Sequence, residues 1–155
     1  MKSLEGMIDQ MHAHARHVLI GKNDEQILPF FHVQFKDRPD AIMATPWRDE
    51  REKSAFIRAI RKSLKHFGSS VVNYATISEA WIAEYDHRPG EADLMPVDRE
   101  SKKECVVVSA GDHKGGKVKI WEIIRDDKGR VTDLVEEKAK LDDFEGRMFN
   151  LLEDE

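Results

Sequence analysis

The sequence predicts an α+β fold in which helices flank a mostly antiparallel sheet of about five strands. Two segments carry apolar residues at helical spacing, and several others alternate or are rich in β-branched and aromatic residues. Most connections between the strand candidates have hairpin length, which is too short for the crossovers of a parallel sheet. The expected element order is therefore α-β-β-α-β-β-β-(β)-α, in a single domain that covers residues 1–155.

The first helix is expected to begin near residue 4 and to stop at Gly21, which suits the position after a helix end. Its apolar stripe consists of Leu4, Ile8, Met11, Ala15 and Val18. Residues 27–45 then predict a hairpin. Phe31, Val33 and Phe35 alternate on one face of its first strand, and the polar turn KDRPD leads into AIMAT.

The second helix has the clearest apolar stripe, made of Phe56, Ile60, Leu64 and Phe67, with Gly68 after its last turn. Its start has two interpretations. Either Thr45 is the N-cap and Pro46 the first helical residue, or Asp49 is the N-cap with Glu52 three residues further on. Both give the same helix body.

The C-terminal half predicts further strands. Residues 71–85 form one long strand, or two strands joined by a bulge near Ser78. Residues 86–103 are a long polar loop of the kind that is usually functional or disordered. Strands follow at 105–110 and 118–124, and 131–135 is a candidate to pair back. A short terminal helix is expected around Phe144, Met148 and Leu151 or Leu152.

This order of elements resembles that of roadblock and profilin-like domains. The resemblance rests on the order alone, and no sequence motif carries it. It therefore implies a fold class and no activity.

Composition predicts a soluble, cytoplasmic protein. Charged residues make up 35% of the 155 residues and the formal net charge is −5, which opposes non-specific attraction to nucleic acid or to anionic membranes. The N-terminus lacks a continuous apolar region, and no segment has the roughly 18 apolar residues of a membrane span. Cys105 has no second cysteine to pair with and precedes a run of valines, so we expect a buried thiol in a reducing compartment.

The segment GDHKGGK contains the spacing of a phosphate-binding loop, with Gly111, Gly116 and Lys117 in the corresponding positions. Val118 stands where such a loop needs a hydroxyl for magnesium, and VKIWEII favours a strand over the required helix. Too few residues remain for the later strand that would supply an acidic metal ligand. We interpret the segment as a hairpin turn whose Asp112, His113, Lys114 and Lys117 form an exposed, flexible charged tip.

Asp127 and Glu136–Lys138 echo a pattern of metal-dependent nucleases. A hairpin turning at Lys128 and Gly129 would place Glu136 opposite residue 121 and about 20 Å from Asp127, which excludes a shared metal. On a helix, His12 and His14 point about 160° apart, and His14 and His17 share a side without a Glu four residues away to complete a metal pair. A zinc site would need His32, His66, His87 or His113 to converge with them. We therefore predict no metal ligands, no cofactor and no catalytic residues.

The second helix carries five cations within about 100° of one another, opposite its apolar stripe. They are Arg51, Arg58, Arg61, Lys62 and Lys65. Such a face is either a solvated helix surface, whose charges also complement the helix dipole, or a surface for an anionic partner such as a phosphate or a nucleic-acid backbone.

The sequence favours a small non-enzymatic binding or assembly module, with self-association through a sheet edge or the first helix. One alternative is a nucleic-acid-associated or phosphate-binding accessory protein that uses the basic helix face. Another is a metal-dependent hydrolase built from the histidines and from Glu79, Glu84 and Asp86. No membrane partner is expected.

Overall fold

The structure is a computed structural model that describes residues 3–44, 49–82 and 103–137. These residues form one six-stranded antiparallel sheet in the order β2-β1-β3-β4-β5-β6. The strands are β1 (Phe30–Phe35), β2 (Ala41–Ala44), β3 (Val71–Ile82), β4 (Lys103–Asp112), β5 (Gly115–Arg125) and β6 (Val131–Glu137). The α+β class and the order of these elements are confirmed. The sheet has six strands because 131–137 does pair back. The expected loop at 86–103 and the expected terminal helix lie outside the described residues, except that Lys103 is the first residue of β4 and not part of a loop.

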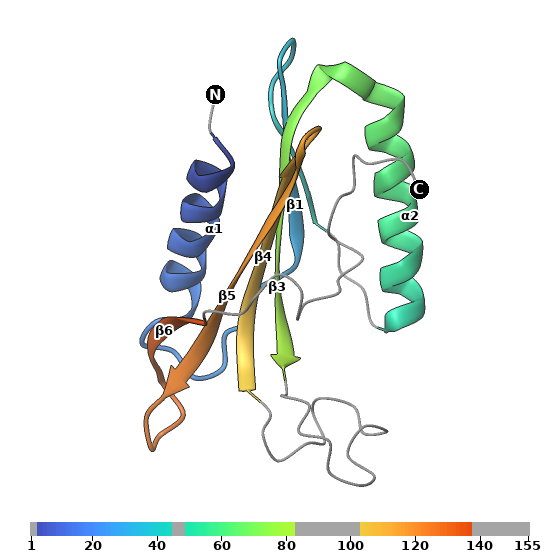
Figure 1. Ribbon diagram of the computed structural model, residues 1–155. Coiled ribbons are helices and arrows are strands. Elements are labelled where there is room, and N and C mark those ends of the chain that lie inside the picture. Colours follow the sequence, from blue (N-terminus) through green and yellow to red (C-terminus); the bar gives the residue numbers. More distant parts are fainter. Residues whose placement is uncertain (1–2, 45–48, 83–102, 138–155) are drawn as a thin grey trace, which may run out of the picture.

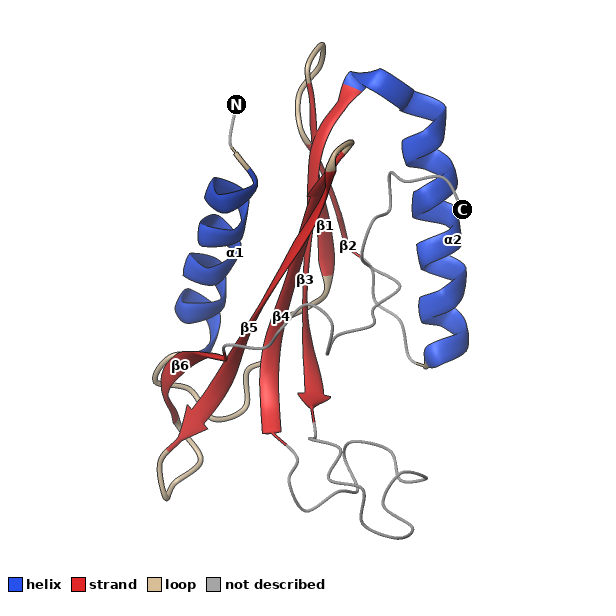
Figure 2. Cartoon of the chain, in the orientation of Figure 1, coloured by secondary structure: helices blue, strands red, loops and turns tan. Residues whose placement is uncertain are grey.

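The two helices lie on opposite faces of the sheet (Figures 1 and 2). Helix α1 (Leu4–Leu19) is followed by Gly21 at φ 82°, as its sequence predicts, and the structure shows Ser3 as its N-cap. Its buried side packs on the central strands, and the core on this face includes Ile8, Met11, Ile77 and Val108. The Glu5 carboxylate receives hydrogen bonds from the ammonium groups of Lys117 (3.0 Å) and Lys119 (3.1 Å) of β5, which lower its pKa.

Helix α2 (Glu50–Phe67) covers the opposite face at the β1–β3 end of the sheet. Of the two possible starts, the structure has the second: the Asp49 side chain accepts a hydrogen bond from the Glu52 amide at 2.8 Å. The expected stripe needs one correction. Ile57, Ile60 and Leu64 are buried, whereas Phe56 is half-buried, because Ile57 lies on the side of the stripe that faces Phe31 and Val33 of β1.

Strand β3 is one continuous strand. Its pairing with β4 runs without a shift from Tyr74 opposite Gly111 to Ile82 opposite Lys103, so the alternative with a bulge near Ser78 is wrong. Shifts in register occur instead near Phe35 and near Arg125. The β5–β6 pairing places Trp121 opposite Glu136, the register that the sequence predicts.

Candidate functional site

Strand β2 forms one edge of the sheet, and no described residue pairs with its outer side. Its four residues, AIMA, are all exposed, with Ile42 at 69% and Met43 at 41%. The strand carries no charged side chain. Among the described residues, nothing covers its outer backbone N–H and C=O groups or its exposed apolar side chains, and such an edge can pair with another strand.

Three charged residues that precede β2, Asp37, Arg38 and Asp40, are engaged within the chain. His32 of β1 and Asp40 are 2.7 Å apart (Nε2 to Oδ2). The Arg38 guanidinium contacts Asp37 at 3.3 Å and lies over the ring of Phe67, 4.9 Å from its centre. Because these groups already have partners, they do not supply an unpaired charge next to the open edge.

A surface pocket of about 330 Å³ lies beside β2 on the α1 face of the sheet. Its lining combines apolar and polar side chains from α1, β1 and β2: Gln10, Met11, His14, Phe30, His32 and Ile42. His14 meets the ring of Phe30 edge-on, with ring centres 5.3 Å apart. The exposed Ile42 of the edge strand is thus also one wall of this pocket.

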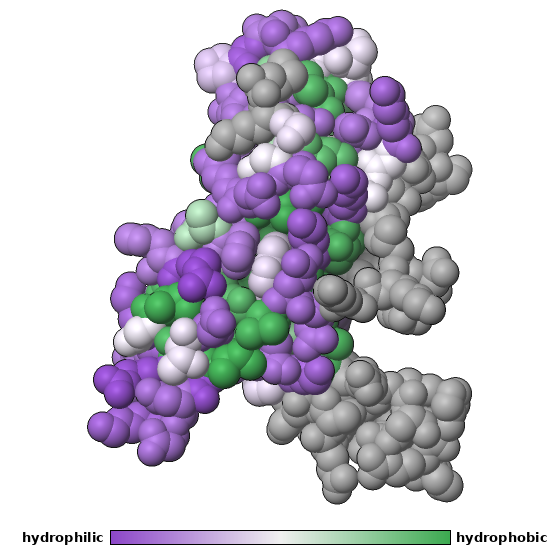
Figure 3. All heavy atoms as spheres, turned by 60° about the vertical axis from the view of Figure 1, so that its left-hand side comes forward, coloured by the Kyte–Doolittle hydropathy of each residue, from purple (hydrophilic) through white to green (hydrophobic). Residues whose placement is uncertain are grey.

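The opposite edge, β6, is closed at its start by the segment after α1. Val131 donates a backbone hydrogen bond to the Lys22 carbonyl at 2.9 Å and accepts one from the Gly21 amide at 2.8 Å. Asp133 forms an ion pair with Arg16 at 3.1 Å, and Glu137 forms one with Lys103 at 2.9 Å. Figure 3, in which the side of the molecule with α1 comes forward, shows a mostly hydrophilic surface with apolar areas between the polar side chains.

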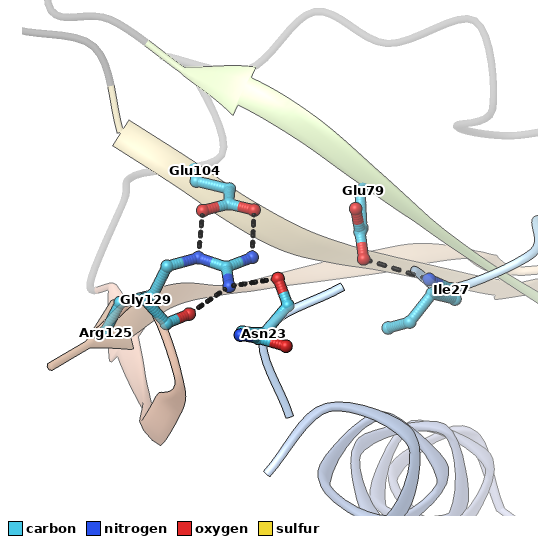
Figure 4. A network of polar contacts seen from close by, with 6 residues as sticks. All are labelled: Asn23, Ile27, Glu79, Glu104, Arg125 and Gly129. Atoms are coloured by element: carbon cyan, nitrogen blue, oxygen red, sulfur yellow. Dashed lines mark hydrogen bonds and ion pairs between the residues drawn. The ribbon is translucent and has the colours of Figure 1, made fainter. Parts of the chain in front are cut away.

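A polar network holds this closing segment in place (Figure 4). Arg125 binds both carboxylate oxygens of Glu104, at 2.9 and 2.8 Å, and donates to the carbonyl oxygens of Gly129 (2.7 Å) and Asn23 (3.4 Å).

Nearby, Glu79 accepts a hydrogen bond from the Ile27 amide at 2.9 Å. Burial raises the pKa of the Glu79 carboxyl, the Ile27 amide opposes this rise, and the charge of Glu104 adds to it. The described contacts of Glu79 indicate a structural role, because its carboxylate holds the backbone of Ile27 in place.

The five cations of the predicted basic face of α2 differ in their exposure to solvent. Arg51, Arg58, Lys62 and Lys65 are exposed, whereas Arg61 is only partly exposed. At 100° per residue Arg61 lies about 40° from Ile57, so its stem borders the buried stripe. The surface therefore presents four exposed cations and one partly covered one.

The described histidines have separate surroundings. His12 stacks on Trp121 with ring centres 4.5 Å apart, and burial lowers its pKa. His66 meets Phe67 edge-on, and His17 is exposed. Over residues 3–44, 49–82 and 103–137, no three His, Cys, Asp or Glu side chains are arranged to hold a metal. His87, Glu84 and Asp86 lie outside the described residues, so the hydrolase alternative is not tested there.

The GDHKGGK segment is a hairpin turn: Asp112 pairs with Gly115, and His113 and Lys114 form the tip. Of the predicted exposed, charged tip, His113, Lys114 and Lys117 are exposed and Asp112 is partly buried. Three of these side chains also have partners within the chain. His113 makes a 2.8 Å hydrogen bond to the Val71 carbonyl, Asp112 accepts from the Lys114 and Gly115 amides, and Lys117 pairs with Glu5. The sequence could not reveal these contacts because two of them join residues distant in the chain.

Cys105 is fully buried, as expected, and burial raises the pKa of its thiol to about 11, with the carboxylates of Glu137 and Glu122 adding to the effect. The thiol is thus a poor nucleophile near neutral pH. Among the described residues, neither helix is both long enough and apolar enough to cross a membrane.

Comparison of the chain with protein-family models, with curated proteins and with solved structures gives no significant match. The resemblance to roadblock and profilin-like domains therefore stays one of element order.

The sequence predicted β2 as a strand, but the exposed edge, the pocket and the His32–Asp40 contact were missed. The spacing of His32 and Asp40 across the predicted hairpin is the signal that was available.

Proposed function

We propose that this chain is a non-enzymatic binding or assembly module that accepts an extended strand of a protein partner along β2. The observation that carries the proposal is the edge itself, a strand of four exposed, uncharged residues with no described neighbour on its outer side. Pairing of this kind draws affinity from main-chain hydrogen bonds and specificity from the side chains on alternate faces.

The two faces of β2 offer different surroundings to a bound strand. Ile42 lies opposite His32 and beside the pocket on the α1 face, whereas Met43 lies opposite Phe31, whose side chain packs under α2. A bound strand would therefore extend the sheet and place an apolar side chain next to Ile42. Charged side chains would find no opposite charge on β2 itself.

Displayed random octapeptides test this proposal directly. The native chain should enrich extended, apolar peptides. Successive residues of an edge strand point their amides alternately inward and outward, so Ile42→Pro and Met43→Pro remove amides on opposite sides of β2. The variant that loses the outward amide should keep its fold and lose peptide binding. Absence of enrichment with the native chain, or equal binding by a folded variant that lacks the outward amide, would contradict the proposal.

The basic face of α2 supports a second candidate function, binding of an anionic partner. Arg51, Arg58 and Lys62 are exposed on one side of the helix. Binding of a generic duplex should then weaken steeply as salt increases, because phosphate contacts release counterions. The triple replacement of Arg58, Arg61 and Lys62 by Glu should abolish it. Binding that is absent, or indifferent to salt, would remove this candidate.

A further inference from the structure

We infer that the strand taken up by β2 is the β2 strand of a second copy of this chain, paired antiparallel with Ile42 opposite Ile42. This inference rests on the proposed strand-pairing function and names its partner. It would join two sheets edge to edge, with the two α1 helices on one face and the two α2 helices on the other.

Symmetry restricts how two β2 strands can pair. A two-fold axis perpendicular to the sheet reverses strand direction and keeps each side chain on its own face. Residues that lie opposite each other must therefore differ by an even number, and one residue must face its own copy. With Ile42 at the axis, Ala41 of each copy faces Met43 of the other, so a small side chain meets a large one on the α2 face.

Side-chain chemistry also fits this arrangement. The Ile42 side chains, each 69% exposed, would lie beside each other on the α1 face, next to the two pockets that they border. Aliphatic pairs directly opposite each other stabilise antiparallel strands. None of the four paired residues in each copy is charged. Asp40 would lie opposite Ala44 of the second copy, and its carboxylate already contacts His32.

The size of the contact sets the expected affinity. Four residues per copy bury much less than the roughly 800 Å² per partner of a standard interface. We therefore expect reversible association with a dissociation constant in the micromolar range or weaker.

Disulfide trapping tests the register. Residues facing each other in antiparallel strands have Cα atoms about 4.5–5.5 Å apart, within the range of a disulfide. The Ile42→Cys variant, mildly oxidised, should form a covalent dimer that a reductant reverses. Val135→Cys is the matched control, because Val135 is an exposed residue (47%) of the other edge strand. The native Cys105 is fully buried, so the unmodified chain should form no covalent dimer under the same oxidation.

Faster crosslinking of Ile42→Cys than of Val135→Cys, together with concentration-dependent association of the unmodified chain in sedimentation, is the expected result. Equal crosslinking rates, or a strict monomer at high concentration, would overturn the inference. If octapeptides still bind the native chain in that case, strand pairing stands and the partner is another protein. If neither occurs, the proposed function fails as well.

Discussion

The two edge strands of the sheet, β2 and β6, differ in how far their outer sides are covered by other residues and in how many charged side chains they carry. At β6 the backbone of Val131 is bonded to Gly21 and Lys22, and the acids Asp133 and Glu137 form ion pairs. At β2 the described residues provide no such cover, and all four side chains are exposed and uncharged.

An exposed apolar edge strand is a template for pairing with another chain, and proteins commonly protect such edges with charges or with covering segments. This chain has both kinds of protection at β6. The same protection at β2 would have required only a lysine or a covering segment there. We interpret the difference as a sign that β2 is the edge that meets a partner.

The largest effect should come from breaking the network behind the protected edge. The Arg125→Met variant leaves Glu104, about a quarter exposed, without its partner and removes the hydrogen bonds to Gly129 and Asn23. We expect the free energy of unfolding to fall by about 2 kcal/mol, because a partly buried charged group loses its hydrogen bonds. Urea denaturation measures this.

Arg130→Met is the control for that variant. Arg130 is 52% exposed and pairs with Asp126 at 3.3 Å, an interaction worth about 1 kcal/mol or less at the surface. Equal losses in the two variants would show that the Arg125 network does not secure this edge.

A charge on the open edge should act on association and leave folding intact. Ile42→Lys would place two ammonium groups opposite each other across the two-fold axis and remove the aliphatic pair. We expect the dimer dissociation constant to rise about tenfold. Val135→Lys makes the same change on the β6 edge and should leave association unchanged. Light scattering over a concentration series distinguishes them, and an equal effect of both variants would remove the difference between the edges.

A smaller, pH-dependent effect should come from His12, which stacks on Trp121 near Asp133 and Glu136 of β6. Burial, and to a lesser extent Arg16, lower the pKa of His12 in the folded chain. The unfolded chain therefore binds the proton first as the pH falls, so stability decreases below about pH 6.5.

The His12→Phe variant keeps an aromatic ring against Trp121 and removes this titration. Its urea midpoint should fall less than that of the native chain between about pH 7.5 and pH 5.5. Equal decreases in both proteins would show that His12 does not contribute to the pH dependence.

Much of the fold could be predicted because the deciding signals are local. Gly21 and Gly68 end the helices with positive φ, and Phe31, Val33 and Phe35 alternate on one face of β1. The position of the turn alone predicts the register of the β5–β6 hairpin, in which Trp121 lies opposite Glu136. These features depend on residues within a few positions of one another.

The candidate site was less predictable because it depends on contacts between distant segments. AIMA indicates a strand, but its position at an edge follows from β1 pairing with β3 on its other side. The bonds that close β6 join residues 21 and 22 to residue 131. The sequence predicted Phe56 as a buried residue of the apolar stripe of α2, whereas Ile57 is buried instead. Both residues lie next to the middle of the stripe on the helix, and packing against β1 decides which of them is buried.

Amide hydrogen exchange of β2, followed by NMR at low and high protein concentration, distinguishes pairing of β2 with its own copy from an unpaired edge. If β2 pairs with its copy, the outward amides of Ala41–Ala44 exchange rapidly in dilute solution and become protected as concentration increases, while the Val131 amide is protected at both concentrations. Outward β2 amides that exchange equally fast at every concentration, with no added strand, would contradict self-pairing at this edge.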